Sequence, residues 1–589
     1  MACFLNAMDK RLGENGRLEL TTSGNVAVDV FNGLLRGASV EKVRGFSKAL
    51  EKEMEEATTT MKEQALTDAF VLFFLTRDPR NGKGERSASM LWFVELAKLF
   101  PLTTMEVLPM IPKFGRWLDV VEYSECDQLP EAMRRALRNL HVEAIRCGED
   151  PLAGKWAPRI TGSKVHVATA KAYARQLFPG DPRADAKYRK ATVALTAKHG
   201  EVTETLMCAQ EGRWKEIDPG KVPAGCLNKH AKALLNEATK KQQQKAKEEG
   251  VPVEVVRSEK EDRVQCAENF KEHAEQACAG NKDKKMHGKT LSIDKMVAEH
   301  LAREPPSSGR SRIIEAQYMN LKEGLLQSLE LAASSSSSLG NMVAMVDVSG
   351  SMTGTPMEAA IGLGTLVSEV TAPAFRGRVL TFSEEPKWHC FKEDMSFKDK
   401  VRSARGADWG MTTDFTKALK LVLRACVDGD VPPSEVASLK LVVFSDMQFD
   451  AAMKNNAQSS SPYYMNAYNR KSREPVVKAW ETQHEELVRM FKEAGECSKF
   501  YEPYPLPRII YWNLRGDTPT HAMVKADTPG VDLVSGFSAL QLKLFLDGED
   551  VADDKQSTPE ETTRKALDAP EYEEVRAACA RVAEWRGLR

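Results

Sequence analysis

The sequence contains no Cys-x-x-Cys pair, although it has 11 cysteines among its 589 residues. These cysteines are scattered, which argues against a zinc module and against the disulfide framework of a small secreted domain. The N-terminal stretch lacks the apolar core of a signal peptide, and no apolar run is long enough to cross a membrane. We therefore expect reduced thiols in a cytoplasmic protein without a membrane partner, with the nucleus as the alternative compartment.

Motifs of the common enzyme classes are also missing. There is no G-x-S-x-G elbow, His484-Glu485 lacks the second histidine of a zinc protease, and Gly82-Lys83-Gly84 is not part of a complete phosphate-binding loop. Gly362 and Gly364 fall inside an expected helix, where close packing explains them better than dinucleotide binding. We predict that the protein is not an enzyme and has no catalytic residues.

Hydrophobic residues make up 42% of the chain and charged residues 28%, as in ordinary globular proteins. The chain is too long for one hydrophobic core, so two or three domains are expected. The formal net charge of −1 carries no information about partners. Only the distribution of charge along the chain can do so.

The hydrophobic pattern divides the chain into four parts. The first part, residues 1–236, has helical periodicity from 25 to 235 and predicts an α-solenoid, a HEAT-like helical array. Residues 237–300 are polar and read as a charged insertion or linker, partly helical and partly disordered, and 301–333 return to the array. Residues 334–589 alternate strands with helices, which predicts a Rossmann-like fold with a mainly parallel sheet. The expected strands are 342–347, 379–383, 440–445, 508–512 and 531–534, and the expected helices are 356–371, 414–427, 474–495, 537–546 and 559–583.

Small oxygen-bearing side chains follow the first of these strands. The apolar run 342–346 ends in Asp347, and Ser349 and Ser351 come next at spacings of two. A similar apolar strand ends in Asp446, and Thr413 lies on a loop between the two. Because ligands bind at the carboxyl ends of parallel strands, these groups are expected to meet there. Hard oxygen donors suit Mg²⁺, or another divalent cation such as Mn²⁺.

This arrangement resembles a von Willebrand factor A domain with its metal-ion-dependent adhesion site. Asp347, Ser349 and Ser351 match the first motif of that site, Thr413 the second and Asp446 the third. The resemblance implies that the serines and the threonine bind the metal directly, while the aspartates act largely through water. It also implies that one coordination position is left for the acidic side chain of a protein partner.

Two signatures in the first half resemble the TROVE module of the Ro ribonucleoprotein. They run from Arg77 to Arg86 and from Ile111 to Trp117. Agreement is closer with an uncharacterised family of the same layout, a helical module followed by a von Willebrand A domain. The resemblance implies binding of RNA, of the small non-coding or misfolded kind. As an alternative, the Arg77–Arg86 stretch is simply a charged turn between helices.

Positive charge is concentrated between residues 152 and 198, where ten Lys and Arg face two acids, a net charge of +8. Basic residues neutralise phosphates, and the interleaved aromatic residues Trp156, Tyr173, Phe178 and Tyr188 could stack on bases. A solvated helical face with its aromatic residues in the core is the alternative. The candidate RNA-binding residues are Lys155, Arg159, Lys171, Arg175, Arg183, Lys187, Arg189 and Lys190.

The sequence is compatible with three functions. The leading one is a non-enzymatic, RNA-associated protein whose second module binds a partner through a divalent metal. Its rival is a metal-dependent protein-interaction scaffold without RNA. A third, in which Asp347 and Asp446 assist phosphoryl transfer, is disfavoured because the other donors are neutral hydroxyls, whereas two-metal catalysis normally uses several carboxylates.

Overall fold

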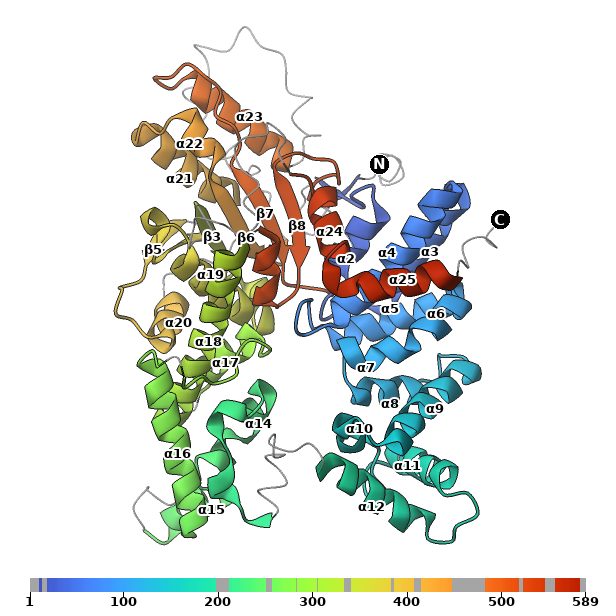
Figure 1. Cartoon of the computed structure of the whole chain (residues 1–589). Helices are drawn as coiled ribbons and strands as arrows, with labels where there is room; N and C mark the ends of the chain where they lie inside the picture. Colours follow the sequence, from blue (N-terminus) through green and yellow to red (C-terminus); the bar gives the residue numbers. More distant parts are fainter. Residues whose placement is uncertain are drawn as a thin grey trace. The chain divides into compact units, whose positions relative to one another are not determined.

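The computed structural model describes residues 10–12, 18–197, 211–250, 257–281, 283–303, 306–332, 341–382, 386–406, 415–447, 483–517, 523–545 and 557–582. The chain forms two compact units whose segments alternate along the sequence (Figure 1). The sheet unit is built from Met1–Ala49, Ile293–Leu301 and Leu326–Asp568. The helical unit is built from Leu50–Ser292, Ala302–Leu325 and Ala569–Arg589. The fold is thus a mixture of α and α/β structure.

A six-stranded sheet with the order β5-β4-β3-β6-β7-β8 organises the sheet unit. All neighbours pair in parallel except β4 and β5. This confirms the predicted mainly parallel sheet and adds one edge strand that the sequence pattern did not indicate, β5. The strands are β3 (Met342–Asp347), β4 (Arg378–Phe382), β5 (Lys387–Cys390), β6 (Lys440–Ser445), β7 (Arg508–Asn513) and β8 (Val531–Ser535).

The apolar run of β3 is explained by burial on both faces of the sheet. Val343 and Met345 belong to a hydrophobic cluster that includes Leu419 of α21 and Phe491 of α23. Val346, on the opposite face, lies against Gly364 of α19, where a Cβ would come within 2.4 Å of its Cγ2 atom. Successive side chains of a strand point to opposite faces, so only a continuous apolar sequence suits this position.

Helices cover both faces of the sheet. Gly362 of α19 leaves room for α17, since a Cβ there would lie 2.8 Å from Ile293 Cγ1. The expected packing role of Gly362 and Gly364 is therefore what the structure shows. The helices of this unit are α2 (Val26–Gly33), α17 (Ile293–Leu301), α19 (Thr355–Val370), α20 (Phe397–Gly406), α21 (Phe415–Asp428), α22 (Pro433–Ala437), α23 (Gln483–Glu496) and α24 (Pro559–Leu567), with short 3-10 turns at Gly350–Met352, Pro373–Phe375 and Ala539–Phe545.

The N-terminal segment joins the sheet unit, which differs from the predicted division at residue 236. The strands β1 (Lys10–Leu12) and β2 (Leu18–Leu20) form a hairpin, and α2 packs on β8. The Ser535 hydroxyl donates to Phe31 O at 3.3 Å, and Ala526 N donates to Ser23 O at 2.9 Å. The physical reason is that α2 is apolar on most sides, so it needs a large apolar surface to cover it.

Successive helices pack on one another in the first part of the helical unit. Trp92 is completely buried, and its indole N–H donates to Ala69 O at 2.9 Å, which joins α5 to α4. The helices here are α4 (Thr59–Arg77), α5 (Arg86–Leu99), α6 (Pro101–Val107), α7 (Ile111–Phe114), α8 (Trp117–Glu125), α9 (Glu131–Cys147), α10 (Pro151–Trp156), α11 (Lys164–Leu177) and α12 (Ala184–Ala197), while α3 (Val40–Glu56) runs across the boundary between the units.

The last helix of the chain, α25 (Glu573–Val582), packs on α4 and α6 of the helical unit. Its preceding turn places Tyr572 on Phe114, with ring centroids 5.5 Å apart. The sequence pattern predicts one helix over 559–583, but in the structure the first helix, α24, ends at Leu567. Pro570 opens a 3-10 turn there, because proline cannot donate the hydrogen bond that a continuing helix requires.

Residues 237–300 are also more ordered than expected, within the part that the structure describes. α16 buries Phe270 completely in a cluster with Leu227 of α14 and Ile313 of α18. Most of the polar residues of this stretch lie on outward faces, while Cys266, Phe270 and Ala274 pack inward. The helices are α14 (Ala224–Leu234), α15 (Lys240–Glu248), α16 (Glu261–Cys278) and α18 (Ser308–Ala332), the last of which crosses into the sheet unit.

None of the helices in the described part of the chain combines the length and the apolar character that a membrane crossing requires.

A buried histidine predicts that acid will weaken the helical unit. His141 is completely buried, stacks on Trp117 and contacts Ala153 O through Nε2 at 2.9 Å. Burial lowers its pKa to about 4, although Ala153 O and Asp150 favour the charged form. Below pH 6.5 the unfolded chain therefore takes up a proton that the folded chain does not, so stability is lost as the pH falls. We expect a loss of about 2 kcal/mol between pH 7 and pH 5.

Urea unfolding of the full chain at these two pH values measures this loss. His141→Gln should make the pH dependence shallower, because glutamine keeps a donor for Ala153 O without titrating. An equally steep pH dependence in the variant would contradict the assignment to His141.

Candidate functional site

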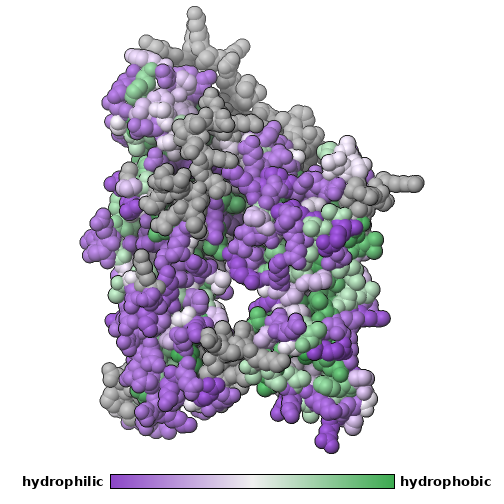
Figure 2. Space-filling view, in the orientation of Figure 1, coloured by the Kyte–Doolittle hydropathy of each residue, from purple (hydrophilic) through white to green (hydrophobic). Residues whose placement is uncertain are grey.

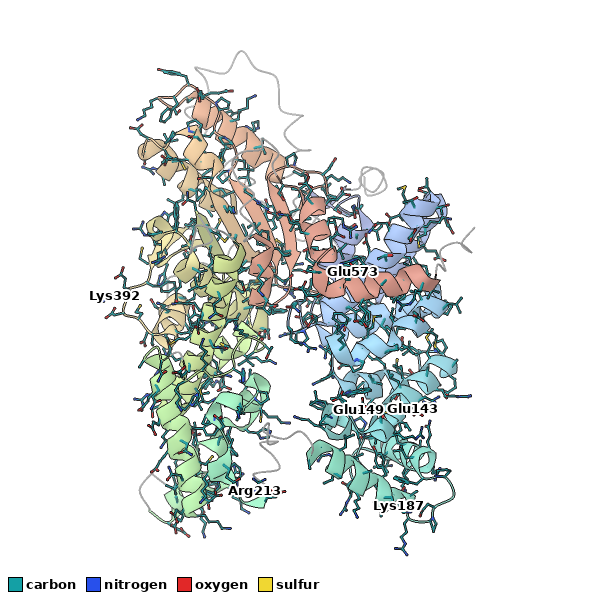
Figure 3. All side chains as sticks on the ribbon, in the orientation of Figure 1. Glu143, Glu149, Lys187, Arg213, Lys392 and Glu573 are labelled. Atoms are coloured by element: carbon teal, nitrogen blue, oxygen red, sulfur yellow. The ribbon has the colours of Figure 1, made fainter. Side chains whose placement is uncertain are left out.

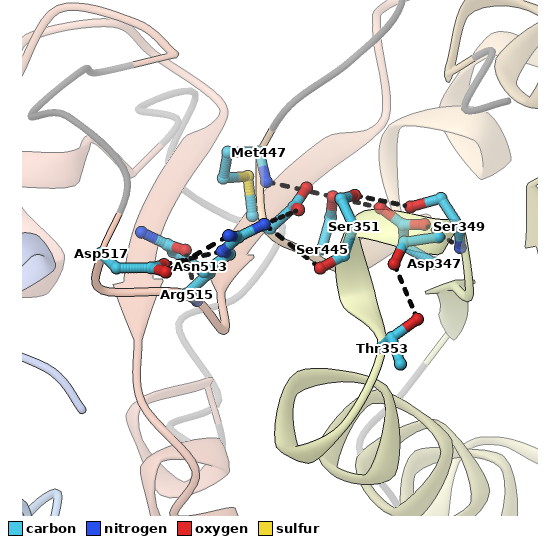
Figure 4. A network of polar contacts seen from close by, with 11 residues as sticks. Asp347, Ser349, Ser351, Thr353, Ser445, Met447, Asn513, Arg515 and Asp517 are labelled. Carbon is cyan, nitrogen blue, oxygen red and sulfur yellow. Dashed lines mark hydrogen bonds and ion pairs between the residues drawn. The ribbon is translucent and has the colours of Figure 1, made fainter. Parts of the chain in front are cut away.

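The predicted oxygen donors of β3 meet in a tight turn at its carboxyl end (Figure 4). Asp347 is completely buried, and its Oδ1 atom accepts from Ser349 N at 2.9 Å. The hydroxyls of Ser349 and Ser351 lie 3.0 Å apart. The 3-10 turn Gly350–Met352 brings them together, with Ser349 buried and Ser351 exposed. One carboxylate and two hydroxyls therefore share a small volume that is open to solvent on one side.

The second carboxylate comes from the neighbouring strand β6. Asp446 follows Ser445 directly and is completely buried. The Ser445 hydroxyl donates to Asp347 Oδ2 at 2.6 Å, which ties the two strand ends together. Met447, the next residue, has a φ of +62°, an uncommon conformation for a residue with a side chain. Such strain gathers at functional sites, because a strained residue persists only where the surrounding structure enforces it.

The electrostatics of the turn favour a bound cation. The pKa of Asp347 is raised to about 7, first by burial and then by the negative charge of Asp446, while hydrogen bonds from Ser445 and Ser349 oppose the rise. Two carboxylates buried side by side are costly unless a positive charge compensates them. A divalent ion bound to these oxygens would supply that charge.

The residues present fit Mg²⁺ or Mn²⁺ by their chemistry. Within the described residues, no group of three or more His, Cys, Asp or Glu side chains is placed to share a metal ion. A cation here would depend on Ser349 and Ser351 and on water, together with the two aspartates, and Mg²⁺ keeps several waters in such sites. The remaining predicted donor, Thr413, lies outside the described residues.

Two polar residues of this site were missed by sequence reasoning. Ser445 holds Asp347, and Arg515 reaches the site from the loop after β7. The signal was available, because Ser445 ends the buried parallel strand β6 and Arg515 follows β7 by two residues, which places both at the same edge of the sheet as Asp347. The Arg515 guanidinium places Nη1 3.2 Å from Ser351 O and 3.6 Å from Asp446 Oδ2.

The candidate RNA-binding residues lie on the surface of the helical unit. Arg159, Lys171, Arg175, Arg183, Lys187, Arg189 and Lys190 are exposed, and Lys155 is partly exposed. Figure 3 labels Lys187 near the start of α12, at the surface, where it forms an ion pair with Asp181. The basic face is therefore accessible to a polyanion.

The aromatic residues of this segment divide into two pairs. Tyr173 and Tyr188 are core residues, with 0% and 2% of their surface exposed, and cannot stack on bases. Trp156 and Phe178 are partly exposed. The guanidinium of Arg116 lies over the Trp156 ring, 5.3 Å from its centroid. For the two tyrosines the structure therefore supports the alternative interpretation, a core role.

Several charged residues of the Arg77–Arg86 signature are also buried. Asp119, completely buried, accepts from Arg77 Nε at 2.8 Å and from Arg116 N at 3.1 Å. Gly82 approaches Leu75 so closely that a Cβ would lie 1.9 Å from its carbonyl oxygen. Arg77 and Asp119 therefore hold the turn together, as the alternative interpretation of a charged inter-helix turn requires, whereas Arg80 is half exposed.

Comparison with known proteins adds two similarities. Residues 341–582 match a family model described as a domain of unknown function, DUF7788. A protein of Acanthamoeba polyphaga mimivirus, itself described as uncharacterized, is 26% identical over 566 residues, which cover 91% of this chain and 84% of that protein. The second similarity extends over both the helical part and the part with the sheet. This agrees with the expected resemblance to an uncharacterised family of the same layout.

Proposed function

We propose that this is a non-enzymatic, RNA-associated protein of the Ro/TROVE type. Its helical unit, a HEAT-like array, binds RNA, of the small non-coding or misfolded kind. Its sheet unit is a Rossmann-like von Willebrand factor A domain that binds a protein partner through a divalent metal. The observation that carries the proposal is the meeting of Asp347, Ser349, Ser351 and Asp446 at the carboxyl edge of the sheet.

The metal part of the proposal follows from charge and donor type. Ser349 and Ser351 would bind Mg²⁺ or Mn²⁺ together with the two aspartates and with Thr413. The bound ion would accept an anionic oxygen from an acidic side chain of the partner, because its charge is not fully neutralised by the hydroxyl donors. Neutral donors in this number suit capture of a ligand better than catalysis.

The RNA part rests on the exposed basic residues of α11 and α12 and on the resemblance to TROVE modules. A rival function is a metal-dependent interaction scaffold without RNA binding. The burial of Tyr173 and Tyr188 favours this rival, because it removes half of the aromatic residues that could stack on bases. The two functions differ in whether the basic face binds RNA.

A triple substitution tests the RNA-binding face. Lys187→Glu, Arg189→Glu and Lys190→Glu together should weaken binding of a fluorescent single-stranded RNA, measured by anisotropy at several salt concentrations. The plot of log K against log salt should become flatter by about two units, because each lost phosphate contact contributes about 0.7. Asp347→Ala should leave RNA affinity nearly unchanged.

The matched control reverses three lysines of α15, namely Lys240→Glu, Lys241→Glu and Lys245→Glu. These residues are also exposed, and the surface over α15 and α16 is hydrophilic (Figure 2). The control carries the same change in net charge and should bind RNA nearly as wild type does. Equal losses in both variants would show unspecific attraction, and no loss in either would favour the scaffold without RNA.

A further inference from the structure

A positively charged side chain is built into the edge of the candidate metal site. Arg515 lies two residues beyond β7, and Figure 4 shows its guanidinium reaching toward the loops that follow β3 and β6. Its Nη1 atom lies 3.2 Å from Ser351 O and 3.6 Å from Asp446 Oδ2. One cation thus contacts the two described loops that carry predicted metal donors.

The position of this guanidinium is fixed from the other side by Asp517. Arg515 Nε donates to Asp517 Oδ1 at 2.7 Å, and Nη2 donates to Oδ2 at 3.2 Å. The Arg515 backbone N–H donates to Asn513 Oδ1 at 2.9 Å. Planar, bidentate pairing of this kind orients a guanidinium more firmly than a single contact does.

The backbone next to Arg515 has little freedom either. At Gly516 a Cβ would lie 2.5 Å from Arg36 O and 2.8 Å from Ala38 N, in the turn that follows α2. Lys42 Nζ donates to Gly516 O at 3.4 Å. The N-terminal segment of the sheet unit therefore holds the loop that presents Arg515, and the arginine is a built element of the site.

Charge decides what this arrangement can do. Asp347 and Asp446 are both completely buried, and the side chain of Arg515 is only 30% exposed. Without a metal ion, the guanidinium offsets part of the negative charge of Asp446. With a metal ion at these oxygens, the same guanidinium repels it, because charges a few ångströms apart in a partly buried site are weakly screened.

We propose that Arg515 is a positioning residue that acts as the internal counter-charge of the site. It holds the Ser351 and Asp446 loops in place when no metal is bound, and it lowers the affinity of the site for a divalent cation. This inference rests on the proposed metal site. It has a functional consequence. An anionic partner group is attracted by both the metal ion and the nearby guanidinium, so it is bound more strongly than by the metal ion alone.

Mn²⁺ titration calorimetry and thermal unfolding of the full chain test the proposal. Arg515→Gln should lower the metal-free midpoint and decrease the Kd for Mn²⁺ by roughly fivefold to tenfold, the size expected for one partly screened charge. Arg515→Lys keeps the charge and should stay close to wild type in Kd. Asp517→Asn removes the carboxylate that competes for the Arg515 guanidinium. The guanidinium then interacts more strongly with Asp446, and the Kd for Mn²⁺ should increase.

The outcomes separate this inference from the proposed function. A Kd for Mn²⁺ that is unchanged or increased in Arg515→Gln would overturn the role of Arg515 while leaving the metal site in place. Absence of Mn²⁺ binding in wild type and in all variants would overturn the metal site and the inference together. If Arg515→Gln fails to fold, Asp517→Asn tests the proposal instead. A decreased Kd for Mn²⁺ in Asp517→Asn would overturn it.

Discussion

Replacing Asp119 with alanine should destabilise the helical unit by about 3–5 kcal/mol, the usual cost of breaking a buried ion pair. Asp119 accepts hydrogen bonds from Arg77 and from both the backbone and the side chain of Arg116. The Arg77 side chain is only 7% exposed, so the substitution would leave a buried guanidinium without its carboxylate. Urea unfolding of the full chain, followed by circular dichroism, measures the loss.

Arg80→Ala is the matched control for Asp119→Ala. Arg80 belongs to the same signature, but its side chain is 54% exposed. Its removal should change the unfolding free energy by about 0.5 kcal/mol or less. If Asp119→Ala were equally harmless, the buried network would not hold the turn. That result would favour a ligand-binding role for the Arg77–Arg86 signature.

Magnesium at the proposed site should stabilise the sheet unit by about 2.7 kcal/mol at a concentration of 100 times its Kd, because that site is formed only in the folded chain. At a fixed Mg²⁺ concentration, this stabilisation should grow as the pH rises from 6 to 8. Since burial and Asp446 raise the pKa of Asp347 to about 7, the folded, metal-free site retains a proton that the unfolded chain loses above pH 3.8. The stability of the metal-free chain therefore falls as the pH rises toward 7. Below pH 7 a metal ion must displace the proton from Asp347 before it can bind, which weakens its binding.

Thermal unfolding of the full chain with and without Mg²⁺ measures this stabilisation. Ser349→Ala should abolish most of it. Thr353→Ala is the control, because Thr353 lies on the same turn but is exposed and donates only to Gly350 O at 2.7 Å. An unchanged midpoint in wild type at millimolar Mg²⁺ would count against the metal site.

The sequence by itself determined the elements whose patterns are local. A continuous apolar run predicted β3 with its correct bounds, and Asp347 follows from it as the polar residue at a strand end. Ser349 and Ser351 likewise lie where their sequence positions place them, directly after the strand at its carboxyl end. These features depend on side-chain periods of 2 and 3.6 and on turn chemistry, which neighbouring residues decide.

Only the tertiary structure decided which distant segments meet. The sequence pattern placed α2 and α25 in helical stretches, but any apolar surface of suitable size could have covered their apolar faces. The same limit applies to Tyr173 and Tyr188, because periodicity does not show whether an aromatic ring on a helix meets the core or a ligand. Arg515 is the strongest case. Its contacts with Ser351 and Asp446 exist because parallel pairing of β3, β6 and β7 brings three strand ends to one edge, and the order of strands in a sheet is a long-range choice that no local pattern contains.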